Sequence, residues 1–170
     1  MTGCGEGVIS FLGIGSNMGD AGANCRDALM RLDQTTGMTL VRHSSLYRTE
    51  PRGIVDQPWF INMAAEIRTV MEPGALLTEL RRIEESMGRR DKKTGGPRII
   101  DLDILFYGQA VIKDADLEVP HREMHRRRFV LVPLSEIAPW TIHPLYGISV
   151  QGLLDRLGDD GIVEKIDDRA

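Results

Sequence analysis

Two aspartates separated by one residue, Asp101 and Asp103, are the side chains of this sequence best suited to hold a cation. They lie in the apolar segment RIIDLDIL, which begins at Arg98 and is typical of a β-strand. Alternate residues of a strand share a face, so both carboxylates would point the same way, about 6–7 Å apart. Such a pair repels itself unless a cation lies between the two groups, and oxygen ligands of this kind suit Mg²⁺. Taken alone, the pattern is better explained by a solvated strand face that bears two acids.

A basic loop directly before these aspartates favours a phosphate ligand. Residues 88–98 hold five basic side chains against one acid, and Arg89 and Arg98 bracket the loop. Guanidinium groups bind phosphate oxygens in pairs and stay charged, while Gly95 and Gly96 allow a close backbone approach. An ordinary solvated charge run would explain the loop by itself. Its direct connection to the aspartates favours a triphosphate that metal and arginines hold together.

A second basic segment follows later in the chain. Residues 121–128 hold four arginines against one acid, and His121 comes directly after Val119 and Pro120. This histidine could donate a hydrogen bond to a phosphate or a ribose, and at least one of the arginines at 126–128 could reach a nucleotide. A packed or helix-capping histidine is the alternative.

Phe60 and Asn62 are expected on one strand face, opposite a set of apolar residues. An aromatic plane beside an amide suits a flat heterocycle, because the ring stacks and the amide pairs with ring nitrogens. Phe129 could supply a second plane. An edge pair on a half-exposed sheet is the alternative. The glycines and polar residues at 13–17 are a weak signal, since the GxxxxGK[ST] phosphate loop is absent.

Hydrophobic periodicity places these side chains on an α+β framework. Strands are expected at 8–14, 39–47, 59–69 and 98–107. One helix is expected between the first two strands, and another from Pro73 to Gly88. The order β-α-β-β-α-β is that of a split β-α-β, ferredoxin-like sandwich.

Two further expectations concern side chains of this framework. In the last strand, Ile100, Leu102, Ile104 and Phe106 would face the core together. Residues 109–170 would form a C-terminal extension with a hairpin arm at Val111 and Ile112 and a helix near 121–137. A last helix after Ser149 would bury three leucines: Leu153, Leu154 and Leu157.

Composition bounds the class of protein. The 170 residues fit one compact domain, with 42% hydrophobic and 27% charged side chains. No apolar run reaches the roughly 20 residues of a membrane span, and the start resembles no secretory signal. Cys4 and Cys25 are too few for a disulfide framework, so we expect a cytoplasmic protein in which neither has a special role. A net charge of −4 with two confined basic segments favours a nucleotide over a nucleic-acid surface.

The sequence resembles the 6-hydroxymethyl-7,8-dihydropterin pyrophosphokinases of folate synthesis. The matching segments are GSNMGD at 15–20, SSLYRTEP at 44–51, DQPWFINMA at 56–64, GPRIIDLDILFYG at 96–108 and VPHREMHRRRFVLVPLSEIAP at 119–139. The resemblance implies one ferredoxin-like domain over residues 1–170. It also implies transfer of the β,γ-pyrophosphoryl group of ATP to the pterin hydroxymethyl oxygen, which gives the pterin diphosphate and AMP.

The resemblance also implies a role for each matching residue. Asp101 and Asp103 match the ligands of two Mg²⁺ ions, and Arg89 and Arg98 match loop arginines that assist the transfer. These four are the expected catalytic residues. The expected ATP contacts are Glu84, Arg89, Arg98, Ile104, His121 and Arg127. The expected pterin contacts are Thr49, Phe60, Asn62 and Phe129.

Four positions depart from the family pattern without removing a metal ligand. Gly95 stands where a tryptophan is common, and Arg52, Arg81 and Arg122 replace other residue types. A non-catalytic pterin- or nucleotide-binding homologue is therefore the alternative function. A ferredoxin-like RNA-binding module is disfavoured, because it would need paired aromatic residues and a basic surface.

The partners expected of the enzyme are small molecules only, namely ATP and the pterin, with no nucleic acid and no membrane. We expect a monomer. We also expect the loops at 48–56 and 88–97 to move and to exclude water from the triphosphate when they close.

Overall fold

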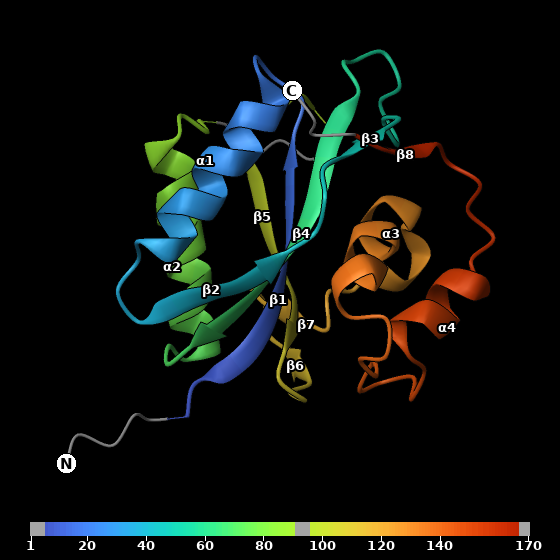
Figure 1. The fold of residues 1–170 in the computed structure, drawn as a ribbon. Helices are drawn as coiled ribbons and strands as arrows, with labels where there is room; N and C mark the ends of the chain where they lie inside the picture. Colours follow the sequence, from blue (N-terminus) through green and yellow to red (C-terminus); the bar gives the residue numbers. More distant parts are fainter. Residues whose placement is uncertain (1–5, 91–95, 167–170) are drawn as a thin grey trace.

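A computed structural model describes residues 6–90 and 96–166 as one central sheet with helices on both faces (Figure 1). Helices α1 and α2 cover one face, and α3 and α4 cover the other. The strands are β1 (Val8–Ser16), β2 (Met38–His43), β3 (Tyr47–Thr49), β4 (Phe60–Thr69), β5 (Asp101–Tyr107), β6 (Ile112–Lys113), β7 (Glu118–Val119) and β8 (Val163–Lys165). The helices are α1 (Ala21–Asp33), α2 (Pro73–Ser86), a 3₁₀ turn (Met124–Arg126), α3 (Arg128–Ile137) and α4 (Val150–Asp155).

The sheet has the ferredoxin-like order that the sequence predicts. Strand β1 lies between β5 and β4 and is antiparallel to both, and the path continues through β3 to β8, while β2 also pairs with β4. The single strand expected at 39–47 is divided into β2 and β3. At the break, Ser44 takes over the pairing, because its amide donates to Ala64 O at 2.8 Å and its hydroxyl accepts from Ala64 N at 2.9 Å. Strand β8 was not predicted.

The hydrophobic core consists of two clusters, one on each face of the sheet. The first packs α1 and α2 against β1, β4 and β5, with Leu12, Leu32, Ile67 and Leu80 fully buried. The residues of the second are Phe11, Ala64, Leu105, Phe106, Met124, Leu131, Leu134, Ile137, Ala138, Val150 and Leu153. The predicted C-terminal extension is therefore a complete third layer, because burial of this second cluster removes the other sheet face from water.

A β-bulge in β5 changes which way Phe106 points. Phe11 of β1 pairs with Phe106, but the next residue, Leu12, pairs with Ile104, so β5 carries one extra residue there. Phe106 therefore packs in the second cluster, with its ring 6.3 Å from that of Phe11. The prediction that Phe106 shares a face with Ile104 is wrong, because strand alternation does not hold across a bulge.

The ends of the helices agree with the sequence signals. Asp20 caps α1 by accepting a hydrogen bond from Ala23 N at 3.0 Å. Helix α2 starts at Pro73, and Gly88 just after it has a φ of +98°, a conformation that glycine adopts without strain. In α4, Leu153 is buried, whereas Leu154 and Leu157 are only half-buried against the second cluster, which corrects the prediction of three buried leucines. Within residues 6–90 and 96–166, no helix has the length and apolar character that a membrane crossing requires.

Candidate active site

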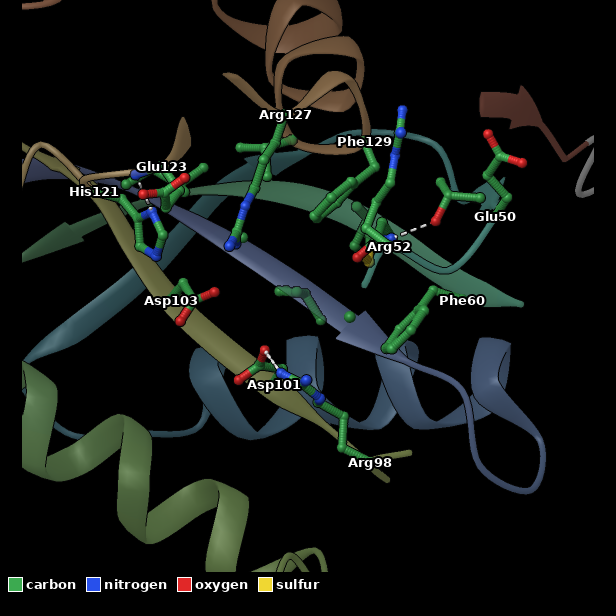
Figure 2. A pocket seen from close by; sticks show the side chains of 18 of the residues that line it. Glu50, Arg52, Phe60, Arg98, Asp101, Asp103, His121, Glu123, Arg127 and Phe129 are labelled. Carbon is green, nitrogen blue, oxygen red and sulfur yellow. Dashed lines mark hydrogen bonds and ion pairs between the residues drawn. The ribbon is translucent and has the colours of Figure 1, made fainter. Parts of the chain in front are cut away.

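A cavity of about 410 Å³ lies between the sheet and the start of α3 (Figure 2). A second cavity of about 390 Å³ shares Arg89, Asp101, Asp103 and His121 with it. The first is also lined by Thr49, Phe60, Asn62, Arg98, Arg127 and Phe129, and the second by Glu84 and Ile104. The structure thus brings every predicted site residue to one of two cavities that meet at the two aspartates.

Two glycines of β1 form part of the floor of the first cavity. A Cβ on Gly15 would lie 2.6 Å from Oδ1 of Asn62 on the neighbouring strand, closer than real Cβ contacts come. A Cβ on Gly13 would only meet Leu105 at 3.5 Å, an ordinary contact. A side chain at position 15 would have to displace the Asn62 amide from its observed position, which gives the weak glycine signal of the sequence a physical reason.

Asp101 and Asp103 share one face of β5, as predicted, but their surroundings differ. Arg89 Nη1 donates to Oδ1 of Asp101 and Arg98 Nη1 donates to Oδ2, each at 2.7 Å. The carboxylate of Asp103 accepts no hydrogen bond from any residue that the structure describes, and Figure 2 shows it at the wall of the cavity. Burial, with the nearby charges of Asp101 and Glu84, raises the pKa of Asp103 from 3.8 to about 7.

This carboxylate pair is suited to a divalent cation whose other ligands are phosphate oxygens and water. Among the described residues, no group of three or more His, Cys, Asp or Glu side chains could hold a metal by itself. Two carboxylates, one of them without a hydrogen-bond partner, leave several ligand positions to water and phosphate oxygens, which is how Mg²⁺ usually binds with nucleotides. A cation here would also relieve the electrostatic cost that raises the pKa of Asp103.

Glu84 anchors Arg89 at the end of α2. The buried Glu84 carboxylate accepts a hydrogen bond from Leu102 N at 3.1 Å and forms an ion pair with Nη1 of Arg89. Burial raises the pKa of Glu84, and the Arg89 charge opposes this rise. Nε of Arg89 is buried without a hydrogen-bond partner among the described residues. The guanidinium is thus positioned between α2 and β5 by the carboxylates of Glu84 and Asp101.

The hydrogen bonding of His121 shows which of its two ring nitrogens carries the proton. Its Nδ1 accepts a hydrogen bond from Glu123 N at 3.2 Å, which assigns the proton of the neutral ring to Nε2. Burial lowers the pKa of His121, and the Arg127 charge lowers it further, so the ring is neutral at neutral pH. His121 can therefore donate one hydrogen bond from Nε2, on the side where Figure 2 shows Asp103.

Aromatic and polar groups gather at the other end of the first cavity. Phe60 comes from β4 and Phe129 from the start of α3, and Figure 2 shows them on two sides of the cavity. Between their elements, Asn62 Nδ2 donates to Thr49 Oγ1 at 2.7 Å. The guanidinium of Arg98 lies 5.8 Å from the centre of the Phe60 ring. An apolar slot with an amide and a hydroxyl can hold a flat, polar-edged heterocycle.

Several lining residues were not predicted as site residues. They include Glu50, Arg52, Gln57 and Glu123 in the first cavity. Gln57 belongs to the segment DQPWFINMA, so its proximity to Phe60 was the one available signal. Arg52, a departure from the family pattern, forms an ion pair with Asp159.

The other departures from the family pattern, and the two cysteines, lie in the following surroundings. Arg81 lines the second cavity, and the Arg122 side chain is largely exposed beside Glu123. Cys25 is a buried free thiol. Cys4, Gly95 and residues 91–95 of the predicted mobile loop lie outside the described residues.

A family model and two of the relatives found by comparison with known proteins name the same enzyme. The family model described as 7,8-dihydro-6-hydroxymethylpterin-pyrophosphokinase (HPPK) matches residues 11–139. The 2-amino-4-hydroxy-6-hydroxymethyldihydropteridine pyrophosphokinase of Methylorubrum extorquens is 42% identical over 153 residues, 90% of this chain and 96% of the relative. The protein of the same name from Bacillus subtilis is 43% identical over 129 residues, 76% of this chain and 77% of the relative.

Longer proteins contain a similar segment. The mitochondrial folate synthesis bifunctional protein of Pisum sativum is 38% identical over 162 residues, but this chain spans only 31% of it. Among solved structures, Plasmodium falciparum HPPK-DHPS with pteroate superposes with a TM-score of 0.71 at 16% identity, over 87% of this chain and 42% of that one. This structural similarity supports the ferredoxin-like fold.

Proposed function

The chain belongs to the 7,8-dihydro-6-hydroxymethylpterin-pyrophosphokinase family, and we propose how its own residues carry out the reaction of that family. It is an ATP-dependent pyrophosphokinase of folate biosynthesis, which transfers the pyrophosphoryl group of ATP to 6-hydroxymethyl-7,8-dihydropterin and releases AMP. The alternative of a non-catalytic homologue is not favoured, because relatives at about 40% identity over most of the chain carry the enzyme's name.

The observation that carries the proposal is the meeting of two cavities at Asp101 and Asp103. In our proposal the pterin enters the first cavity, between Phe60 and Phe129, and the nucleoside part of ATP enters the second, against Ile104. The triphosphate would then extend from the second cavity to the first, past Asp101 and Asp103, which line both. This places the hydroxymethyl oxygen beside the β-phosphorus, and positioning of this kind supplies much of the rate of a phosphoryl transfer.

The metal roles follow from the fit of the carboxylates. Asp101 and Asp103 would hold two Mg²⁺ ions, which neutralise phosphate charge and orient the triphosphate when bound. Asp103 is open to a ligand as it stands, whereas both oxygens of Asp101 are engaged by arginines.

The remaining polar groups would bind the two substrates. Arg89, Arg98 and Arg127 donate to phosphate oxygens, where their charge stabilises the transferring group. His121 donates from Nε2 to a phosphate, and Glu84 keeps Arg89 in place. Asn62 and Thr49 would pair with polar atoms of the pterin rim, and the two phenylalanine rings stack on its faces.

Three broader features belong to the same proposal. Residues 1–170 would act as one pyrophosphokinase domain. A monomer is part of the proposal, since this chain supplies all the proposed site residues and the site needs no residue from a second copy. A cytoplasmic location fits the buried free thiol of Cys25, which a reducing compartment would preserve.

A product assay tests the residue roles. With ATP, Mg²⁺ and the reduced hydroxymethylpterin, mass spectrometry should detect AMP and pterin diphosphate in equal amounts. Asp101→Ala and Asp103→Ala should each lower turnover on the order of 10²–10³-fold or more, with a far smaller effect on folding. Asp155→Ala, at an exposed position of α4, is the control. Near-wild-type AMP release by both site variants would refute the metal assignment.

A further inference from the structure

Asn17, the residue directly after β1, lies at a junction of three segments. It is 3% exposed, and it lines neither of the two cavities. Its Oδ1 accepts a hydrogen bond from Arg98 N at 2.8 Å, and its own backbone N donates to Arg98 O at 3.1 Å. Its Nδ2 donates to Pro58 O and to Gln57 Oε1, each at 3.0 Å. One buried amide thus binds two loops that are 40 residues apart.

The amide uses all of its hydrogen-bonding atoms in this way. An asparagine side chain has two N–H donors and one oxygen, and here both donors go to one loop while the oxygen goes to the other. A buried polar group left without its partner costs about 1–3 kcal/mol, so a shift of either loop would disturb the amide's bonds to the other. Hydrogen bonds at both ends therefore make the two loop positions depend on each other.

Each of the two loops carries a different part of the site. Arg98 leads into β5 and donates to Asp101 at the phosphate end. Gln57 and Pro58 lead into β4, whose first residue, Phe60, lines the first cavity at the pterin end. Arg98 and Phe60 also approach each other directly, with the guanidinium 5.8 Å from the ring centre. The Asn17 side chain is a second connection between the same two loops.

We propose that Asn17 is a positioning residue through which occupancy of the nucleotide part of the site strengthens binding in the pterin part. Phosphates that hold Arg98 would order its backbone, and the Asn17 amide would pass that order to residues 57–60. Coupling of this kind is reciprocal, so the pterin should strengthen nucleotide binding by the same factor. The inference rests on the proposed assignment of the two cavities to the two substrates.

The test compares pterin affinity with and without a bound nucleotide. The probe is α,β-methylene-ATP with Mg²⁺, in which the bond that the transfer would break is replaced by a methylene link. Wild-type protein should bind the hydroxymethylpterin at least about fivefold more tightly with the analogue present. Asn17→Asp keeps an oxygen for Arg98 N but turns an oxygen toward two acceptors, so it breaks the Gln57 and Pro58 half selectively. Its affinity ratio should fall to near one.

The matched control is Asn24→Asp in the same region. Asn24 donates to Ser16 Oγ and Met18 O but reaches neither loop, so this variant should keep the wild-type ratio. In steady-state kinetics, Asn17→Asp should raise the KM for the pterin more than it lowers kcat. A ratio of one in wild-type protein, or an unchanged ratio in Asn17→Asp, would overturn the inference.

A second measurement needs no variant and covers the case in which Asn17→Asp does not fold. Hydrogen exchange of the wild-type protein should show that the nucleotide analogue alone protects the amides of Gln57, Trp59 and Phe60. No added protection at these amides would overturn the inference even if turnover is normal. Wild-type protein that forms no AMP and binds no pterin would overturn the proposed roles of the cavities as well, so the two failures are distinguishable.

Discussion

At the scale of single residues, the two carboxylates of β5 differ in their hydrogen bonds to arginine. Both oxygens of Asp101 accept hydrogen bonds from arginines, whereas Asp103 has no such partner among the described residues. A cation can therefore meet Asp103 directly, but it competes with Arg89 and Arg98 for Asp101. In the proposed binding mode, the two displaced guanidinium groups would lie beside the triphosphate, where they could donate hydrogen bonds to its phosphate oxygens.

Arg89→Ala separates phosphate contacts from pterin contacts. Turnover should fall on the order of 10²-fold or more, because a charged donor to the transferring group is lost. Affinity for the pterin alone should remain near that of the wild type, since Arg89 touches the phosphate end of the cavity. Steady-state kinetics and calorimetry measure the two effects, and exposed Arg90→Ala is the neighbouring control. A variant that changed pterin binding only would show that this role for Arg89 is wrong.

Asp103 also makes stability depend on pH in protein freed of divalent cations. Its pKa is about 7 in the folded protein and 3.8 when unperturbed, so the folded state binds the proton more tightly. Its contribution to the free energy of unfolding is therefore full below pH 4 and is lost as the pH rises through about 7. Urea denaturation in EDTA from pH 4 to pH 8 should show this decline in wild-type protein, and Asp103→Asn should remove it. Parallel curves for the two proteins would contradict the prediction.

At the scale of elements, Glu136 near the end of α3 connects this helix to the sheet. Its carboxylate accepts hydrogen bonds from Ser45 N at 3.1 Å, from Ser45 Oγ at 2.8 Å and from the Tyr47 hydroxyl. Burial alone would raise the pKa of Glu136, but these bonds lower it. Because β3 carries Thr49 and α3 carries Phe129, this connection sets the spacing of two walls of the first cavity.

Glu136→Ala should lower the free energy of unfolding by about 1–3 kcal/mol, since three donors at the edge of the sheet lose their acceptor. It should also weaken pterin binding, because α3 would lose its hydrogen bonds to Ser45 and Tyr47. Glu164→Ala is the control: the Glu164 side chain forms an exposed ion pair with Arg48 at 3.6 Å, so this substitution should cost at most about 1 kcal/mol. Equal effects of the two substitutions in urea denaturation would contradict the role of Glu136.

At the scale of the whole molecule, the sheet is a shared wall between two hydrophobic clusters. Helices α3 and α4 cover the face that carries Phe11, Leu105 and Phe106, so this half is part of the core rather than an appendage (Figure 1). The first cavity lies on this same face of the sheet, next to the start of α3. Loss of packing beneath α3 would therefore reach both stability and the site.

Leu131→Ala tests this unity, because Leu131 is fully buried in the second cluster. The cavity left behind should cost about 2–5 kcal/mol, and unfolding should remain a single cooperative transition in both fluorescence and circular dichroism. Leu145→Ala, at a leucine that is 56% exposed, should change stability little. Two separate transitions would show that the α3 and α4 layer folds independently of the rest.

Local spacing made much of this protein predictable. The DLD pattern, the flanking arginines and the ferredoxin-like order of elements are properties of short segments, and strand alternation alone placed Asp101 and Asp103 on one face. The failures come where pairing between distant segments decides. The bulge in β5 arises from its register with β1, the division into β2 and β3 arises from Ser44 against Ala64, and β8 exists only because it pairs with β3.

By itself, the sequence determined which chemistry the chain carries, because residue type and spacing specify charge, donors and ring planes without reference to distant segments. Only the tertiary structure decided how those groups are held. It joined two cavities at one pair of carboxylates, turned Phe106 into the second cluster, and closed the Asn17 amide between loops 40 residues apart. Hydrogen bonds and packing between remote segments form only when the chain folds, and no local pattern encodes their partners.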